Sequence, residues 1–354
     1  MHLGIIGLPF SGKTTIFIAL TDGDLPPDIK SGTGRIEVRT AVVDVPDPRL
    51  DALSALMKPR KTTYSKVTYA DVGGYTVDSG LSGALANQLV QMDGLIHVVR
   101  AFEDPTAPHP MGSVDVKRDI STMESEFLLY DMLTVERRLE RLAEERQKGV
   151  RDRAILDREI ALFERLSAHL DEQAPLRDLA LRLEQKQVLA GYGLLTDKPL
   201  LIVINLDESS PRVEMDAPGE RVHVLNFYGK LEMEIAQLQA DEALTFLEEY
   251  GISEPARERV VRASYHLLGL QSFFTINERE ARAWTLPRNG TALEAAGMVH
   301  SDMARGFIRA EVIGCQELLE LGGLAQARAE GKLRLEGKDY VVQDGDVIYI
   351  RFNI

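Results

Sequence analysis

A shortage of cysteine is the first constraint that this sequence sets. Among 354 residues there is one cysteine, Cys315, so no disulfide bond can form within the chain. A protein that does without disulfides suits a reducing compartment. We interpret Cys315 as a small packing residue beside a strand and not as a redox group.

Positive charge and long apolar runs are also scarce. The 41 Lys and Arg residues are outnumbered by 55 Asp and Glu residues, which gives a formal net charge of −14. This charge argues against a broad electrostatic attraction to nucleic acid or to an anionic membrane, although one domain can still carry a local basic patch. No apolar run approaches the ~18 residues of a membrane span, and the first run ends within seven residues, too soon for a signal peptide. We expect a soluble cytoplasmic protein with no membrane contact.

Strand-like and helix-like segments alternate in the N-terminal part of the chain and again beyond residue 195. Apolar strand patterns and helical patterns occur at residues 2–7, 12–20, 39–45, 65–72, 83–92, 94–102, 198–205, 221–227 and 230–238. This alternation predicts an α/β fold with a mostly parallel sheet covered on both faces. A length of 354 residues indicates two or three domains. We assign residues 1–118 and 196–265 to the α/β domain.

The segment 119–195 has a different composition. Apolar residues recur at every third or fourth position of residues 121–149, with charged residues between them, which is typical of an amphipathic helix. Residues 155–170 and 176–195 continue this pattern. We predict a helical insertion, and two arrangements are equally consistent with it. One is an antiparallel arm, and the other is a bundle packed flat on the α/β domain.

The last 84 residues, 271–354, are predicted to form a separate small module. They contain two strand patterns joined by a polar turn, a short helix at 291–300, and further strands with Gly-Lys and Asp-Gly turns. This order predicts a mixed β sheet that packs around one helix.

The opening residues carry the pattern G-x-x-x-x-G-K-[ST] from Gly7 to Thr14, between an apolar strand and a helix. In that context the glycines let backbone N–H groups point at phosphate oxygens, and the helix N-terminus adds positive potential. We expect Lys13 to reach the β- and γ-phosphates of a nucleotide and the Thr14 hydroxyl to bind Mg²⁺. The predicted nucleotide-binding residues here are Pro9, Phe10, Ser11, Gly12, Lys13, Thr14 and Thr15.

A second element, the D-x-x-G sequence from Asp71 to Gly74, begins at the end of a predicted strand. Asp71 can hold Mg²⁺ through water, and the Gly74 N–H can face the γ-phosphate. We therefore predict catalytic roles for Lys13 and Gly74 and metal-binding roles for Thr14 and Asp71. Tyr75 comes next, where many GTPases place a glutamine that orients the attacking water. A tyrosine cannot orient water as an amide does, and packing explains Tyr75 as well as a catalytic role does.

The base-reading position follows the strand 198–205, where GTPases commonly carry N-K-x-D. Here Leu206 replaces the lysine and Glu208 replaces the aspartate, which otherwise accepts two hydrogen bonds from guanine. Adenine therefore becomes at least competitive with guanine. Asn205 can bond the base or tie loops together, and the stretch can instead be a simple strand exit. The predicted base-side residues are Asn205, Leu206, Glu208, Tyr228, Gly229 and Lys230.

Seven stretches together resemble the YchF/Obg-like ATPase family over nearly the whole chain. They are GIIGLPFSGKTT, VPDPRLDAL, ADVGG, HVVRAFED, INLDE, FIRAEVI and, most specifically, GKLRLEGKDYVVQDGDVIYIRFN. The resemblance implies a P-loop G-type domain, a coiled-coil insertion at 119–195 and a C-terminal TGS domain, a β-grasp module, at 271–354. It also implies a preference for ATP over GTP, with an N-x-x-E motif at Asn205–Glu208, and a ribosome-linked role in translation or stress response.

Two stretches depart from the family pattern, and both belong to the γ-phosphate end. Arg35 stands where the family has a threonine near Mg²⁺, with Thr33 as a nearby substitute. The loop after Gly74 is shorter than in the family, and no histidine lies between Asp71 and His97. We expect nucleotide binding to be retained and hydrolysis to be slow, rewired or lost.

Three functions follow from these observations. The first is an Mg²⁺-dependent ATP-binding switch with weak ATPase activity that acts on the ribosome or another translation-related partner. The second is a GTPase, because Glu208 still offers a carboxylate to a guanine. The third is a protein with weak or no turnover that docks on RNA or the ribosome through the TGS domain and the arm. Phosphate release with ATP and with GTP discriminates among them.

Overall fold

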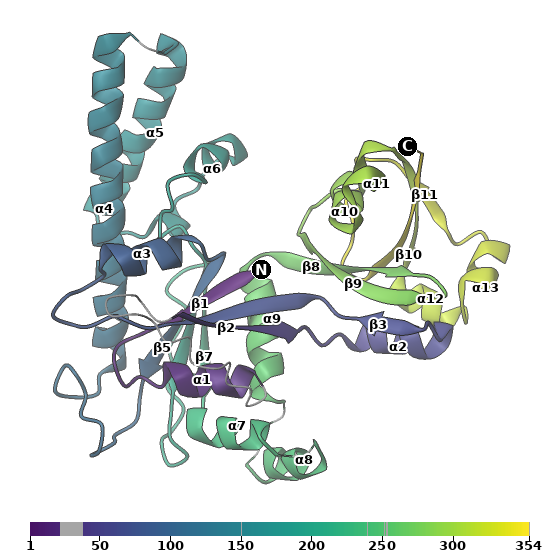
Figure 1. Cartoon of the computed structure of the whole chain (residues 1–354), viewed down its shortest axis with the longest axis horizontal. Coiled ribbons are helices and arrows are strands. Elements are labelled where there is room, and N and C mark those ends of the chain that lie inside the picture. The colour runs from purple at the N-terminus through teal and green to yellow at the C-terminus, as the bar shows by residue number, and fades with distance from the viewer. Residues whose placement is uncertain (22–37, 150, 239, 251, 253, 354) are drawn as a thin grey trace. The chain divides into compact units, whose positions relative to one another are not determined.

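The computed structural model describes residues 1–21, 38–149, 151–238, 240–250, 252 and 254–353 (Figure 1). The chain forms two compact units. The first joins Met1–Val42 to Thr68–Val260, and the second joins Val43–Val67 to Val261–Ile354. Thr33 and Arg35, to which the sequence assigns a place near the metal, lie outside the described residues.

The first unit is built on a sheet with the strand order β2-β4-β1-β5-β6-β7. Its strands are β1 (His2–Ile6), β2 (Val38–Asp44), β4 (Lys66–Val72), β5 (Gly94–Arg100), β6 (Leu200–Asn205) and β7 (Val222–Phe227). The strand pairings from β4 through β1, β5 and β6 to β7 are all parallel. Every residue of β5 and β6 is buried, because a central parallel strand is covered on both faces. The predicted α/β fold is confirmed, and the carboxyl ends of these strands meet at one edge.

Helices cover both faces of this sheet. On one side α1 packs beside α7, and on the other α3 and α4 contribute to a shared apolar core with the strands. The helices of the sheet region are α1 (Lys13–Leu20), α3 (Gly83–Val90), α7 (Gly229–Ala236) and α8 (Ala240–Glu249). Helix α9 (Ala256–Leu267) begins in the first unit and belongs to the second from Val261 onward.

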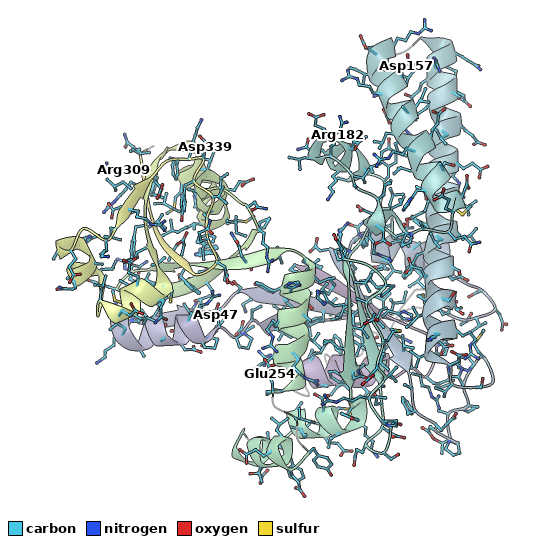
Figure 2. The ribbon with its side chains drawn as sticks, turned by 180° about the vertical axis from the view of Figure 1, so that it is seen from behind. Asp47, Asp157, Arg182, Glu254, Arg309 and Asp339 are labelled. Atoms are coloured by element: carbon cyan, nitrogen blue, oxygen red, sulfur yellow. The ribbon has the colours of Figure 1, made fainter. Side chains whose placement is uncertain are left out.

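The helical insertion is an arm and not a flat bundle. Helices α4 (Val116–Lys148) and α5 (Arg153–Asp171) lie side by side and project away from the sheet (Figure 1). They enclose an apolar core of their own, and Asp157 marks the region near the tip (Figure 2). The helix expected over residues 176–195 is broken into the short 3₁₀ helix η1 (Leu176–Asp178) and α6 (Leu183–Leu189).

A buried carboxylate fastens the base of the arm to the first unit. Asp131 on α4 is fully buried and accepts hydrogen bonds from the backbone N–H groups of Leu195 and Thr196, both at 2.8 Å, and from the Thr196 hydroxyl at 2.6 Å. Beside it, buried Arg177 pairs with Glu124 of α4 at 2.9 Å. Because buried polar groups must be paired, these contacts fix where α4 leaves the sheet.

The second unit is a mixed sheet with the order β11-β10-β12-β8-β9-β3. Its strands are β3 (Lys61–Thr63), β8 (Leu270–Ile276), β9 (Glu280–Pro287), β10 (Phe307–Gly314), β11 (Arg334–Glu336) and β12 (Asp346–Phe352). Its helices are α2 (Pro48–Met57), α10 (Ala292–Val299), α11 (Ser301–Arg305), α12 (Cys315–Glu320) and α13 (Leu324–Ala329). The predicted helix at 291–300 is α10, whose Ala292 and Ala295 pack against the sheet. Buried Cys315 packs in the other core of this unit.

Residues 43–67 belong to this second unit, although the expected boundary placed them in the α/β domain. Leu50 and Leu53 of α2 are fully buried against Phe274, and β3 pairs in parallel with β9. Arg49 joins Asp47 to Asp344, with distances of 2.8 and 2.9 Å. Figure 2 labels Asp47 at the start of α2. Apart from the Arg49–Asp47 pair, these contacts join segments more than 200 residues apart, so local sequence patterns carry no sign of them.

Among the described residues, no helix is both long and apolar enough to span a bilayer.

Candidate functional site

The turn from β1 to α1 has the backbone of a phosphate-binding loop. Gly12 has a φ of +91° and is the N-cap of α1, and Phe10 has a φ of +61°. A Cβ atom on Gly7 would lie 2.3 Å from the Val98 carbonyl oxygen, so only glycine fits there. No side chain caps α1, and its first turn has no acidic residue. The N–H groups of this helix terminus are therefore available to an anion.

The Lys13 ammonium group folds back across the loop. Its Nζ donates hydrogen bonds to the carbonyl oxygens of Gly7 at 3.0 Å and Leu8 at 2.9 Å. Burial lowers the pKa of Lys13, and the nearby Asp71 carboxylate opposes this effect. A phosphate oxygen would be a stronger acceptor than a carbonyl oxygen because it carries negative charge.

Thr14 and Asp71 come together as predicted for a metal site. Thr14 Oγ1 donates to Asp71 Oδ2 at 2.8 Å, and Asp71 is buried near the end of β4. Both groups are hard oxygen ligands, the type that Mg²⁺ prefers, usually together with substrate phosphates and water. Within the described part of the chain, no group of three or more His, Cys, Asp or Glu residues could hold a metal by itself. The residues fit an ion that a nucleotide helps to hold.

Tyr75 is a packing residue. The backbone turns at Gly74 with a φ of +95°, and the next side chain, Tyr75, is only 5% exposed in the apolar core beside the sheet. Desolvation raises the pKa of Tyr75 to about 12. Of the two interpretations of this tyrosine, the structure therefore favours packing over the orientation of a water molecule.

Asn205 ties two loops together. Its Nδ2 donates to the Ser11 carbonyl oxygen at 2.9 Å, and its Oδ1 accepts from the Gly229 N–H at 3.0 Å. A Cβ atom on Gly12 would lie 2.1 Å from Nδ2, and one on Gly229 would lie 2.4 Å from Oδ1. The two glycines therefore make room for a buried amide that joins the phosphate loop to the predicted base side.

A cavity of about 280 Å³ lies at the predicted base side. Glu208 and Lys230 are exposed there, whereas the Leu206 side chain points into the core. Asp207 accepts hydrogen bonds from Ser210 and Ser209 within its own turn, which lower its pKa. The lining residues are Leu206, Asp207, Glu208, Ser209, Tyr228, Lys230 and Leu231.

The remaining predicted residues lie in or beside the phosphate loop. Ser11 is buried, Pro9 and Thr15 are partly buried, and the Phe10 ring is 60% exposed. Sequence reasoning missed Ser209 and Leu231, which line the base-side cavity. Their proximity to residues that were predicted is the only signal that could have indicated them.

Sequence reasoning also missed His97, a buried histidine on β5. Burial, and secondarily the charge of Lys13, lower its pKa to about 3, so the imidazole is neutral. Its Nε2 has no hydrogen-bond partner among the described residues. A single histidine in an apolar strand gives no sequence signal that it will lie near Lys13.

Comparisons with known proteins bear directly on this arrangement. A family model named YchF-GTPase_C and described as a protein of unknown function (DUF933) matches residues 270–353. A protein of Bacillus subtilis (strain 168) named ribosome-binding ATPase YchF is 38% identical to the chain, with 99% of each sequence covered. The chain belongs to the YchF family.

Further relatives extend the similarity across bacteria and to a solved structure. The protein of the same name from Pasteurella multocida is 37% identical over 99% of each sequence, and that from Mycoplasma genitalium is 32% identical over 100% of each. A solved structure of the Schizosaccharomyces pombe YchF GTPase matches with a TM-score of 0.85 and 27% identity, covering 99% of this chain and 97% of that one. The expected family and the fold class are thus confirmed for this YchF family member.

Proposed function

We propose that this chain binds ATP with Mg²⁺, hydrolyses it slowly, and acts as a nucleotide switch on the ribosome. The observation that carries the proposal is the connection made by Asn205. It joins the phosphate loop, where Lys13 lies, to the cavity lined by Glu208 and Lys230. One end of this arrangement suits phosphates and the other suits a base, at the carboxyl edge of a parallel sheet.

Each residue has a defined part in the proposed reaction. Lys13 binds the β- and γ-phosphates in place of its present carbonyl acceptors. Thr14 and Asp71 hold Mg²⁺, which when bound neutralises charge on those phosphates. The Gly74 N–H faces the γ-phosphate. Because Tyr75 is buried in the core, this chain has no side chain directly after Gly74 that orients water, which supports slow hydrolysis.

The base-side residues support ATP over GTP. Leu206 is buried and offers the base no charge, and Asp207 is engaged by its own turn. Glu208 is the remaining carboxylate of the motif, on an exposed and longer side chain. The ribosome is proposed as the partner because the bacterial relatives are named ribosome-binding ATPases.

Equilibrium binding and turnover measured together test this function. We expect non-hydrolysable ATP to bind more tightly than the matching GTP analogue, binding to weaken when Mg²⁺ is chelated, and phosphate release from ATP to be slow. Tighter GTP binding would instead identify a GTPase. Binding without any release would identify a docking protein whose nucleotide acts only as an effector, and no binding of either nucleotide would contradict the proposal.

A further inference from the structure

The loop that follows Gly74 is held by a side chain of the arm. Residues 76–80 form a tight turn in which Gly80 N–H donates to the Thr76 carbonyl oxygen at 3.0 Å. The turn ends at Leu81, whose backbone N–H donates to Glu126 Oε2 of α4 at 2.8 Å. Gly80 has a φ of +58°, and a Cβ atom there would lie 2.8 Å from the same carboxylate oxygen. The backbone of this loop thus lies against Glu126 with no space between them.

Apolar contacts reinforce this hydrogen bond. Tyr75, Val77 and Leu81 of the loop pack into the same core as Met123 and Phe127 of α4. Met123 and Phe127 lie three residues before and one residue after Glu126, on the side of α4 that faces the sheet. The loop is therefore held on α4 by apolar side-chain contacts and by the hydrogen bond from Leu81 to Glu126.

Helix α4 carries these contacts and the arm in one element. It runs without interruption for 33 residues, from Val116 to Lys148, so Glu126 and the distal end of the arm belong to the same helix. An α-helix rises about 1.5 Å per residue and is stiff over this length. A displacement of the loop after Gly74 at Glu126 would therefore tilt α4 about the buried contacts that hold Asp131, and the tilt would move the distal end of the arm.

We propose that Glu126 is a positioning residue that couples the γ-phosphate end of the nucleotide site to the helical arm. The inference rests on the proposed function, because it needs a nucleotide whose γ-phosphate meets Gly74. With the γ-phosphate present, the loop keeps the position in which Leu81 reaches Glu126. Without it, the loop loses that position and α4 loses the restraint at Glu126, while the buried contacts of Asp131 continue to hold the base of the helix. Coupling between sites is reciprocal, so a partner that holds the arm also changes the affinity for ATP relative to ADP.

The test compares Glu126→Ala and Glu126→Gln with a matched control, Glu136→Ala, on the exposed side of the same helix. The readout is the ratio of affinities for a non-hydrolysable ATP analogue and for ADP, measured on the full chain with Mg²⁺. We expect Glu126→Ala to lower this ratio at least about fivefold, the lower end of typical coupling, while ADP affinity stays constant. Glu126→Gln should restore most of the ratio, because its amide oxygen still accepts from Leu81.

A second readout follows the arm directly. Hydrogen exchange of α4 and α5 should differ between the ATP-analogue and ADP complexes of the wild type, and this difference should disappear in Glu126→Ala. A ratio equal to that of Glu136→Ala would overturn the coupling. An equal loss of affinity for both nucleotides would also overturn it, since that is the effect of a merely structural contact.

The proposed function has its own control in the same samples. If Lys13→Ala loses nucleotide binding while Glu126→Ala keeps the wild-type ratio, only the coupling fails. If the wild type itself binds no nucleotide, the proposed function fails and the coupling fails with it.

Discussion

The phosphate end and the base end of the candidate site are built differently. At the phosphate end, Lys13 and Thr14 already donate to acceptors of the chain itself, the Gly7 and Leu8 carbonyl oxygens and Asp71. At the base end, Glu208 and Lys230 are exposed around a cavity. A phosphate must therefore replace these acceptors of Lys13 and Thr14, and a charged ligand does so because it accepts stronger hydrogen bonds than a carbonyl oxygen. The base meets an open surface, on which selectivity depends on a few exposed groups.

This difference predicts that affinity resides mainly at the phosphate end. Lys13→Ala should weaken ATP binding about 100-fold, because a hydrogen bond to a charged group contributes about 1.5–3 kcal/mol. Lys230→Ala at the base end is the matched control and should weaken binding less than about tenfold. Isothermal titration calorimetry measures both, and equal losses for the two lysines would remove the proposed asymmetry.

The next largest effect is expected from removing Asn205, the residue that joins the two ends. Asn205→Ala should lower the free energy of unfolding by about 1–3 kcal/mol, because Ser11 C=O and Gly229 N–H lose a buried partner. It should also weaken ATP and ADP binding together. Asn226 lies on β7 opposite Ile204 and makes the same pair of backbone hydrogen bonds, but to Val213 instead of Ser11 and Gly229, with distances of 3.0 and 3.1 Å.

Asn226→Ala is therefore the control for stability alone. Denaturant unfolding should give similar losses for the two variants, and nucleotide binding should weaken only in Asn205→Ala. If Asn226→Ala weakened binding as much, the bridge would have no special part in joining the ends.

Buried His97, which lies near Lys13 of the phosphate end, should make the free energy of unfolding depend on pH. Its folded pKa of about 3 lies below the ordinary value of 6.5, so the unfolded chain binds the proton more tightly. The stability that this histidine contributes is present above pH 6.5 and falls as the pH drops toward 3. Between pH 6.5 and pH 5 the loss is roughly 2 kcal/mol, at about 1.36 kcal/mol for each pH unit.

His97→Leu removes this titration, so the difference in unfolding free energy between pH 7.5 and pH 5 should shrink by that amount. His2→Gln, at an exposed histidine, should leave the difference as it is in the wild type. An unchanged pH dependence in His97→Leu would show that His97 is not buried in its neutral form.

The smallest expected effect is at the base end. Glu208→Ala should lower GTP affinity more than ATP affinity, because guanine presents two adjacent donors, N1–H and the N2 amino group, to one carboxylate, whereas adenine presents only its N6 amino group. We expect the preference for ATP to rise about five- to tenfold, the value of one net hydrogen bond of roughly 1 kcal/mol. Competition between the two nucleotides for one fluorescent analogue measures the ratio. A fall in the preference would place Glu208 against adenine.

The two ends of the site also differ in how well the sequence predicts them. The phosphate end is contiguous, so Gly7, Lys13 and Thr14 were recognisable from spacing alone, and Asp71 from its place at the end of a strand. Asn205 was also predicted, but the sequence could not tell whether it bonds the base or joins loops. Its partners Ser11 and Gly229, which lie far away in the sequence, show that it joins loops. The role of Tyr75 likewise depends on its burial, because the sequence alone allowed both packing and catalysis.

Long-range packing accounts for what the sequence did not reveal. The apolar pattern predicted α4 and α5, yet nothing in it indicated that Glu126 would bond a loop 45 residues earlier. Similarly, the residues of α2 gave no sign that Leu50 and Leu53 would complete the core of the C-terminal unit. Local patterns specify helices and strands, whereas contacts between distant segments depend on the whole fold.

The claim that two separate ends make one nucleotide site is tested most directly by hydrogen exchange of the full chain with and without an Mg²⁺–ATP analogue. The account predicts slower exchange in residues 7–20 and, at the same ligand concentration, in residues 205–210 and 228–232. Protection confined to one of these regions, or absent from both, would contradict it.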